Sequence, residues 1–581
     1  MTATPATGYN RGMTASPSPM SPHVPAWIEV RRGIAPLLFF APHAGRRTLP
    51  RRPGRDKVND LHTGGLTREL GAACDATWII NTARDRNEID LNRTPQVREH
   101  ASWLLEFLAT TLEEMVAERG RATLFAVHGW NVVQAVCDLG VGLVEENGAC
   151  RRAARGDVTV SRAFLHAYLR RMQRLASVQN VLVTIGVRYP AAHPSNLMQL
   201  LTPGRVDDAD PLLRRLARLA DRVDAVQLEV GIPLRWRGPR RSAFVRTLAD
   251  VFAAAPPDSA PRREGDRDGE GAASFDSPRA AVGATLACGG RPTTRVALQV
   301  ASAELAVLTS VDVAPAGAIA GRLLITDAAE RLALFTGELA ERHTHTLHVP
   351  ALRVDVRDHH AFDVRFAGPL LAFPMLTPFA DLERGLAAGN LRDARLHLRF
   401  APASPLADLP AGAARFGTVT GVVRLGGTRH RVRALAWASA GLAPPRRHPS
   451  ARLVLPGTAL GDLELCSTDA GDSSSEGPRS SALTAVFRFA LTGTAWSDMR
   501  STPVRGVADV HLDEPATVRV RVQTASGASR VLAGRPERLI PVRRPGSSGS
   551  VVESVYALCR FTVAPTGWLE LTVEHAAGDA D

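Results

Sequence analysis

The chain has 581 residues, of which 45% are hydrophobic and 22% charged, and 70 lysines and arginines stand against 58 aspartates and glutamates. A chain of this length needs more than one hydrophobic core, and its composition excludes a fibrous or wholly disordered protein. The basic runs at 46–55 and 235–241 hold one tryptophan between them and match no nucleic-acid-binding motif. We therefore predict that they are solvated surface and expect no nucleic-acid partner.

Cysteine usage and hydropathy indicate the compartment. The six cysteines are scattered without a CxxC motif, which favours reduced thiols that are mostly buried. Residues 1–25 are rich in Thr, Ser, Pro and Ala and hold no hydrophobic signal core, and no later run reaches the ~18 apolar residues of a membrane span. We expect a disordered tail over 1–25 and a cytoplasmic, soluble protein without a membrane partner.

Apolar runs alternate with amphipathic segments between residues 26 and 256. The runs predicted as strands are 27–30, 34–41, 76–80, 123–127, 180–185 and 225–230. The segments predicted to hold helices are 56–73, 96–119, 161–176, 211–222 and 241–255. This alternation predicts an α/β domain with a mostly parallel sheet and helices on both faces, as in hydrolase- and phosphorylase-like folds.

The pattern changes after a charged segment rich in Pro, Gly and Ser, which we predict to be a linker over 257–280. From 281 to 581, short segments of alternating hydrophobicity are separated by turn residues; they include 395–400, 419–424 and 432–437. This pattern predicts an all-β region, a sandwich or a lipocalin-like barrel, with room for two related lobes.

The stretch Thr82–Arg93, with the sequence TARDRNEIDLNR, is unusually rich in charge. It carries three arginines, three carboxylates and two asparagines directly after a predicted buried strand. A solvated loop can hold such charges, but this stretch lies between hydrophobic elements, where fixed charge has to be paired or offset by a charged ligand. We predict a site for an anionic substrate, with Arg93 as a forked carboxylate binder.

Other polar residues stand at the ends of predicted strands, where open α/β sheets place their sites. His43 and His128 follow such strands, and Asp60 or His62 lies near the start of a predicted helix. Two histidines and a carboxylate are a usual ligand set for a catalytic Zn²⁺, with a glutamate nearby as general base. Each residue alone can be structural, but Glu229, inside the apolar run AVQLEV, needs a partner or a metal.

Several segments occur in the order seen in N-formylglutamate amidohydrolases: PHAG at 42–45, Asp60–Thr63, RNEIDLNR at 86–93, His128 and QLE at 227–229. Over roughly residues 26–250 the chain resembles this family, a branch of the zinc carboxypeptidase and aspartoacylase superfamily. The resemblance implies a Zn²⁺ ion held by His43, His128 and Asp60, with His62 as the competitor of Asp60.

The same resemblance implies roles for the charged stretch. Arg93, with Asn92, would hold the carboxylate of the substrate. Arg86 would polarise the scissile carbonyl and stabilise the oxyanion. Glu229 would take a proton from the attacking water and pass it to the leaving amine, while Asp90 would orient the arginines.

The sequence departs from the family pattern at three points, one of which is that Gly129, Trp130 and Asn131 follow His128 in place of the serine often found there. Arg46 is the third residue after His43, where the carboxypeptidase branch carries a glutamate ligand, and a Gly-Gly substrate loop is absent between Arg188 and Gln227. The expectation is therefore hydrolysis of an N-acyl or amide bond in a carboxylate-bearing substrate, with formylglutamate as one example of that class.

The β region resembles the lipocalin-like domains grouped with carotenoid hydratases, through residues 417–437 and 506–512. The RDHSWG-like motif of such domains is missing. The resemblance implies a domain that binds an apolar ligand or packs on the hydrolase without chemistry of its own. The alternative function is a catalytically inactive hydrolase fold whose β region binds an apolar small molecule.

Overall fold

The computed structural model describes the following residues: 24–47, 57–146, 149–206, 208–253, 294–301, 305–313, 319–327, 332–338, 341–343, 346–357, 361–373, 382–403, 407–409, 412–442, 450–458, 461–467, 486–497, 500–511, 517–524, 529–545, 551–561 and 564–575. The expected tail, apart from residues 24 and 25, and the expected linker lie outside these residues. Among the described residues, no helix has both the length and the hydropathy needed to cross a bilayer.

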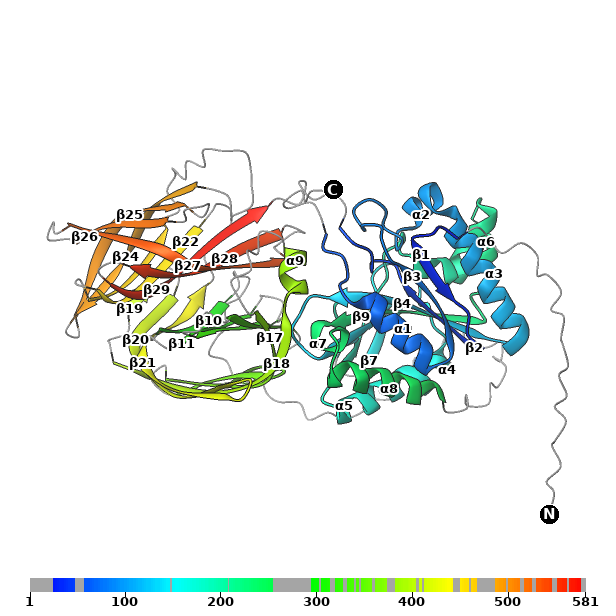
Figure 1. Ribbon diagram of the computed structural model, residues 1–581, viewed down its shortest axis with the longest axis horizontal. Coiled ribbons are helices and arrows are strands. Elements are labelled where there is room, and N and C mark those ends of the chain that lie inside the picture. The colour runs from blue at the N-terminus through cyan, green and yellow to red at the C-terminus, as the bar shows by residue number, and fades with distance from the viewer. Residues whose placement is uncertain are drawn as a thin grey trace, which may run out of the picture.

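The N-terminal half contains a seven-stranded mixed sheet of order β1-β3-β2-β4-β9-β5-β8 (Figure 1). Its strands are β1 (Ile28–Arg31), β2 (Ala35–Ala41), β3 (Ala76–Asn81), β4 (Ala122–Trp130), β5 (Val136–Gly140), β8 (Leu182–Ile185) and β9 (Val223–Gly231). The pairs β2–β3, β2–β4, β4–β9 and β5–β8 are parallel, whereas β1–β3 and β5–β9 are antiparallel. A mixed sheet built on parallel central strands thus carries this half.

Helices cover both faces of this sheet. The main ones are α1 (Thr63–Ala73), α2 (Thr94–His100), α3 (Ser102–Arg119), α5 (Arg170–Val178), α6 (Pro211–Ala217) and α8 (Pro239–Ala253). Apolar residues of α1, α5 and α8 join one core cluster, and those of α3 and α6 join a second cluster with the other face. The shorter elements are β6 (Leu143–Glu146), β7 (Ala149–Arg152), α4 (Arg162–Phe164), η1 (Leu165–Leu169), η2 (Leu197–Leu201), η3 (Pro203–Arg205) and α7 (Ile232–Arg235).

The ends of two helices follow directly from the local sequence. The carboxylate of Asp210 accepts hydrogen bonds from the backbone N–H groups of Leu212 and Leu213, and Pro211 needs no donor partner at the first helical position. Helix α3 ends at Gly120, whose φ of 77° is a left-handed conformation that glycine adopts without a steric penalty. The single helix predicted over 96–119 is divided because buried Ala101 leaves the helical conformation between α2 and α3.

The described residues of the C-terminal half form β-strands apart from helix α9 (Leu382–Ala387), and every pairing between these strands is antiparallel. A twelve-stranded sheet runs β13-β12-β11-β10-β21-β20-β18-β17-β16-β15-β14, with β19 attached to β20. Because β13 also pairs with β17, the strands from β13 round to β17 form a ring. A second set, β22 to β29, is a closed barrel, so the half comprises two lobes.

The bounds of the strands of the first lobe are β10 (Thr294–Ala301), β11 (Leu305–Val313), β12 (Ile319–Asp327), β13 (Leu332–Gly337), β14 (Glu341–His343), β15 (Thr346–Val349), β16 (Leu352–Val356), β17 (Phe362–Phe373), β18 (Asn390–Pro402), β19 (Ala407–Leu409), β20 (Gly412–Leu425) and β21 (Thr428–Leu442). Those of the barrel are β22 (Ser450–Thr458), β23 (Gly461–Ser467), β24 (Val486–Ser497), β25 (Arg500–His511), β26 (Thr517–Thr524), β27 (Ser529–Pro545), β28 (Val551–Phe561) and β29 (Ala564–His575).

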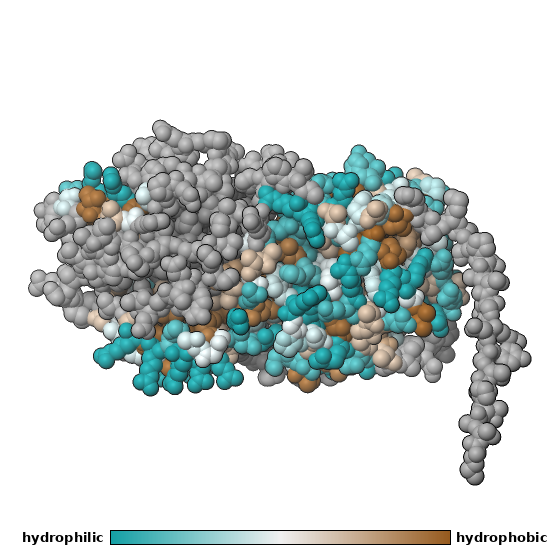
Figure 2. All heavy atoms as spheres, viewed as in Figure 1, coloured by the Kyte–Doolittle hydropathy of each residue, from teal (hydrophilic) through white to brown (hydrophobic). Residues whose placement is uncertain are grey.

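Strand β18 separates an apolar interior of the first lobe from a basic exterior. Its Leu396, Leu398 and Phe400 are buried, whereas the alternating Arg395 and Arg399 are exposed. Neighbouring strands continue this outer face with exposed arginines at 365, 424, 429, 431 and 433. Hydrophilic side chains gather along the lower edge of this half in Figure 2, over β18, β20 and β21.

One row of this outer face consists of arginines alone. Arg395 of β18 lies directly opposite Arg424 of β20, and Arg424 lies opposite Arg429 of β21. We call these three residues the arginine row. Direct cross-strand neighbours on one face have Cβ atoms ~5 Å apart, so the three positive charges repel one another.

The two halves are in contact at the carboxyl edge of the α/β sheet, and α9 lies at their boundary in Figure 1. Val133, Ile232 and Trp236 belong to the same core cluster as the apolar residues of the first lobe. The indole N–H of Trp236 donates to the carbonyl of Gly389 at 3.0 Å, which adds a directional contact. The β half therefore packs on the edge where α/β sheets carry their sites.

Candidate active site

The candidate residues gather at the carboxyl ends of three neighbouring parallel strands. His43 follows β2 by two residues, and His128 lies near the end of β4. Glu229 lies near the end of β9 and pairs in register with His128. Crevices at this edge are the usual position of sites in open α/β sheets, because the loops that leave the strands there can surround a ligand.

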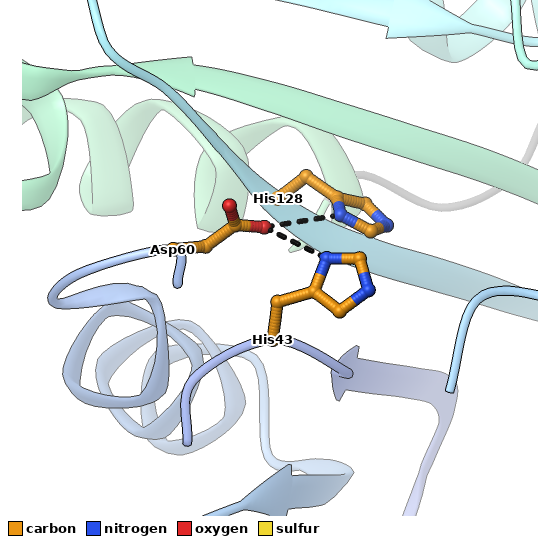
Figure 3. Close-up of side chains that lie close together, drawn as sticks. All are labelled: His43, Asp60 and His128. Carbon is orange, nitrogen blue, oxygen red and sulfur yellow. Dashed lines mark hydrogen bonds and ion pairs between the residues drawn. The ribbon is translucent and has the colours of Figure 1, made fainter. Parts of the chain in front are cut away.

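His43, Asp60 and His128 converge on one point (Figure 3). The Asp60 Oδ2 atom lies 3.2 Å from Nδ1 of His43 and 3.2 Å from Nδ1 of His128. One ligand atom from each residue lies within 4.8 Å of the others, and all three side chains are buried. Sequence analysis left Asp60 and His62 as alternatives, and the structure brings Asp60 to the two histidines.

His62 lies elsewhere. Its imidazole packs on the Trp236 ring with the ring centroids 4.3 Å apart, and its backbone has a φ of 64° at the start of α1. The described His, Cys, Asp and Glu residues that form a metal-sized group are His43, Asp60 and His128, without His62.

A second carboxylate sets the orientation of His43. Its Nε2 lies 2.7 Å from Oδ1 of Asp90, a short contact in which the ring N–H donates to the carboxylate. A carboxylate behind a histidine is the usual support for a metal-ligating imidazole, because it fixes the tautomer and leaves the other nitrogen free. Sequence analysis expected Asp90 to orient the arginines, and its Oδ2 atom forms a looser ion pair with Nε of Arg93 at 3.9 Å. The principal partner of Asp90 is therefore His43.

The contact between His43 and Asp60 is electrostatically unfavourable in the absence of a further proton or a cation. With its proton on Nε2, His43 turns a lone pair toward the Asp60 carboxylate, so two acceptors face each other at 3.2 Å. A second ring proton or a cation between the groups resolves this repulsion. Because His128 turns its Nδ1 to the same oxygen, the arrangement suits a cation bound to all three side chains.

The protonation states also suit metal binding. Burial opposes charge on Asp60, but the Arg86 guanidinium, followed by the contacts with His128 and His43, holds its pKa well below the usual range. Burial lowers the pKa of His128 to about 4, against the hydrogen bond to Asp60 that raises it. At neutral pH the cluster thus presents an ionised carboxylate and a neutral imidazole, the forms that bind metals.

Glu229 is held by a network of side-chain amides. The Gln227 Nε2 atom donates to Oε1 of Glu229 at 2.8 Å. The Oε1 atom of Gln227 accepts hydrogen bonds from Asn92 at 3.2 Å and from Asn196 at 2.8 Å, which fixes the direction of its amide. Burial, followed by the charge of Asp60, raises the pKa of Glu229 well above its ordinary value.

This network includes Asn92, whose expected contact with the substrate stays a prediction. The amide N–H₂ of Asn92 is directed to Gln227, and its Oδ1 is buried without a hydrogen-bond partner in the described structure. Asn196 and Gln227 were not selected as functional residues from the sequence. Gln227 stands two residues before Glu229, so its side chain lies on the same face of β9, a signal that alternation in the strand provides.

The two candidate substrate arginines differ in exposure. Arg86 is mostly buried; its Nη1 contacts the Asp60 Oδ1 atom at 3.1 Å, and its Nε has no hydrogen-bond partner in the described structure. The Arg93 side chain is 37% exposed, and its Nη1 lies 3.2 Å from Nδ1 of His193. Arg86 is thus part of the buried cluster, whereas Arg93 lies at its rim.

Comparison with known proteins adds weak structural neighbours. No protein-family model and no curated protein matches the sequence. The solved structures with similarity include an N-formylglutamate amidohydrolase from Ralstonia eutropha JMP134, at 14% identity and a TM-score of 0.26, covering 39% of this chain and 96% of that one. A putative AttH from Nitrosomonas europaea, at 11% identity and a TM-score of 0.26, covers 51% of this chain and 98% of its own.

A kievitone hydratase from Nectria haematococca, at 8% identity and a TM-score of 0.23, covers 49% of this chain and 88% of that one. These identities and TM-scores are too low to transfer an activity. Function is therefore inferred below from the side chains of the site.

Proposed function

We propose that the chain is a Zn²⁺-dependent amidohydrolase that cleaves an N-acyl or amide bond in a carboxylate-bearing substrate of the N-formylglutamate type. The observation that carries this proposal is the buried His43–Asp60–His128 cluster beside the protonatable Glu229. Two imidazoles and one carboxylate are the donor set of hydrolytic zinc sites, which keep a further position open.

Zn²⁺ held by His43, Asp60 and His128 would supply a Lewis acid and lower the pKa of a water molecule at the site. Glu229 acts as the proton carrier. One of its oxygens is held by Gln227, which leaves the other free to take the proton of the attacking water and deliver it to the leaving nitrogen. Its raised pKa favours this exchange, because a carboxyl that titrates nearer to neutrality can both accept and donate.

The arginines bind and orient the substrate. The unpartnered Nε of Arg86, beside Asp60, can donate to the carbonyl oxygen as negative charge develops on it. Arg93 at the rim can receive the substrate carboxylate in a forked contact, and His193 beside it adds a further polar group. A substrate held between these two arginines would place its acyl–nitrogen bond over the histidine cluster.

The test combines metal analysis with one substitution. The purified full chain should bind one equivalent of Zn²⁺, and His128→Ala should lose it. Glu229→Gln should retain the metal but lower kcat on N-acyl amino acids by roughly 10²–10⁴-fold, the usual contribution of general acid–base catalysis. A chain without affinity for Zn²⁺, or a Glu229→Gln variant with unchanged activity, would overturn the proposal.

Asp224→Asn is a matched control for Glu229→Gln. Asp224 is a buried carboxylate at the opposite end of the same strand, where it pairs with Arg121 at 2.9 Å. Its replacement should lower stability and leave kcat unchanged, because it does not contact the cluster.

The alternative of an inactive scaffold with an apolar ligand in the β half has less support from the described residues. Large side chains such as Phe335, Phe366 and Phe400 belong to one continuous apolar cluster of the first lobe and pack on other aromatic rings there. Glu229 would also be an unexplained buried carboxyl on that interpretation, since its burial is costly without a function.

A further inference from the structure

A carboxylate from the β half contacts the loop that carries Asp60. Glu383, in the first turn of α9, accepts a hydrogen bond from the backbone N–H of Asn59 at 3.1 Å. The side-chain Nδ2 of Asn59 lies 3.4 Å from both oxygens of the same carboxylate. A single side chain of the C-terminal half thus receives two donors of one residue of the N-terminal half.

Asn59 connects this contact to the candidate metal centre. It is fully buried and directly precedes Asp60, and its Oδ1 accepts a hydrogen bond from the backbone N–H of Arg86 at 3.0 Å. Arg86 in turn contacts Oδ1 of Asp60 at 3.1 Å. Asn59 therefore lies between Glu383 and two residues of the site.

We propose that Glu383 is a positioning residue for the metal centre, so that the β half completes the site of the hydrolase. This inference rests on the proposed function. Asp60 lies in a segment without helix or strand before α1, where its own N–H donates to the carbonyl of His43 at 2.8 Å but no strand ladder holds the preceding Asn59. The Glu383 carboxylate substitutes for such a ladder, because it satisfies the buried donors of Asn59 in one orientation.

Removing that carboxylate leaves the buried backbone N–H of Asn59 without its acceptor and the side-chain Nδ2 with only the 3.4 Å contact to Oδ1 of Asp85. Such donors are costly, so the loop would move to reach water or another acceptor. A shift of Asn59 would also displace Asp60, which follows it in the chain, and the Arg86 backbone, which is hydrogen-bonded to its side chain. Since a metal site requires its ligand atoms within a few tenths of an ångström, the affinity for the ion would fall before the fold is lost.

Other polar contacts between the described parts of the two halves involve residues away from the three ligands. The Val133 N–H donates to Oγ1 of Thr336, and the Glu338 N–H donates to Oε1 of Gln134. Arg240 contacts Asp393 at 2.7 Å in an exposed ion pair. Asp393 therefore offers a matched control, since it is also an acidic residue of the β half that contacts the N-terminal half.

The experiment compares Glu383→Ala, Glu383→Gln and Asp393→Ala in the full chain. Zn²⁺ affinity is measured by competition with a chelating dye, and the geometry of the site by the absorption spectrum of the Co²⁺-substituted protein. Glu383→Ala should raise the Kd for Zn²⁺ about tenfold and alter the Co²⁺ spectrum, as loss of outer-shell support does elsewhere. Glu383→Gln keeps the acceptor oxygen and should retain most of the affinity, while Asp393→Ala should match the wild type.

The outcomes separate this inference from the proposed function. A wild-type chain that binds no metal overturns both. A wild-type chain that binds Zn²⁺, with a Glu383→Ala variant within twofold of its Kd, overturns only the role of Glu383. If Glu383→Ala does not fold, Glu383→Asp decides, because its shorter side chain withdraws the carboxylate from Asn59: a Co²⁺ spectrum that differs from those of the wild type and Asp393→Ala supports the role, and an unchanged spectrum overturns it.

Discussion

Arg93 lies at the rim of the site, in a position to select substrates by charge. Its side chain is partly exposed and has a histidine nitrogen beside it, so a carboxylate can approach without displacing a buried partner. Charge-assisted hydrogen bonds contribute about 1.5–3 kcal/mol each, and partial exposure reduces the contribution. Arg93→Ala should therefore lower kcat/KM on N-acyl amino acids by roughly 10–100-fold.

The control for Arg93→Ala is a second substrate that lacks the carboxylate, rather than a second variant. For the methyl ester of the same substrate, which lacks the carboxylate, wild type and variant should have equal kcat/KM. An equal loss on both substrates would show that Arg93 supports the fold or the metal centre instead. No loss on either would favour an esterase-like activity without carboxylate recognition.

Glu229 gives a stability prediction that can be measured without a substrate. Burial and the charge of Asp60 raise its pKa above the ordinary 4.5, so the folded chain binds more protons than the unfolded chain above that pH. The stabilisation that comes from the protonated form of Glu229 is fully present below pH 4.5 and is lost as the pH rises through the pKa of Glu229 in the folded chain. In the metal-free protein, Glu229→Gln should therefore be stabilising relative to the wild type, increasingly so at higher pH.

The measurement is urea unfolding of the metal-free wild type and variant at pH 5 and pH 8. The difference in unfolding free energy should grow by up to about 1.4 kcal/mol per pH unit within the interval between the two pKa values. Asp224→Asn, on the same strand, should not reproduce this trend. A Glu229→Gln difference that is constant between pH 5 and pH 8 would contradict the raised pKa.

At the scale of elements, the loops after β2 and β3 are locked together at Gly45. A Cβ atom at this position would lie 1.8 Å from the carbonyl oxygen of Arg84, which is backbone and cannot rotate away. The two loops are also joined by the hydrogen bond from the Arg46 N–H to the carbonyl of Ala83. Glycine in the PHAG segment is therefore required by a close approach of backbones.

Gly45→Ala should separate these loops and destabilise the chain by roughly 2–4 kcal/mol, in the range of severe single substitutions. It should also weaken Zn²⁺ binding, because His43 and Asp90 lie on the separated loops. The measurements are urea unfolding and dye competition. Gly65→Ala is the matched control: its Cβ would meet only the side-chain guanidinium of Arg241, at 3.0 Å or more, and no backbone atom, so a smaller change in both quantities is expected.

Much of this edge of the sheet was accessible from sequence because it depends on local patterns. Apolar runs ending in His43, His128 and Glu229 predict strand ends, and parallel strands bring such ends together. Strand β5 was missed because it follows β4 with too few residues for a helix between them, and its antiparallel pairing with β9 breaks the alternation. The Asn59–Glu383 contact has no local signal, since its residues are 324 positions apart.

The side-chain partners in the site were harder to predict than its members. Asp90 was expected beside the arginines, and only the folded loop shows it behind His43. Asn92 was assigned to the substrate, which stays a prediction, and its amide contact with Gln227 was not predicted. Charge and amide groups in one short stretch identify a polar site, whereas the direction of each side chain depends on neighbours supplied by other strands.

At the scale of the molecule, the carboxyl edge of the α/β sheet is covered by a second half that a self-sufficient hydrolase would not require. The core cluster of the first lobe includes residues of the loops after β4 and β9. These loops belong to the same edge as His128 and Glu229. The two halves are therefore expected to unfold cooperatively, with metal binding raising the unfolding temperature of both.

The arginine row on the outer surface of the first lobe has a consequence for the conditions under which this chain is handled. Arg395, Arg424 and Arg429 repel one another across adjacent strands, so the lobe is electrostatically frustrated at low ionic strength. The Debye length falls from about 30 Å at 0.01 M salt to about 10 Å at 0.1 M, which relieves such repulsion. The chain should accordingly melt at a higher temperature in 0.5 M NaCl than in 0.01 M.

Arg424→Glu places an opposite charge between the two remaining arginines and converts both repulsions into attractions. It should stabilise the lobe by about 0.2–1 kcal/mol per pair at low salt and flatten the salt dependence of the melting temperature. Thermal unfolding at the two salt concentrations measures both effects, and an unchanged slope would show that the row is fully solvated. The same arginines also oppose self-association, because a dense band of like charge keeps the outer faces of two copies of the sheet apart. Salt weakens this barrier between copies while it stabilises the fold of each one.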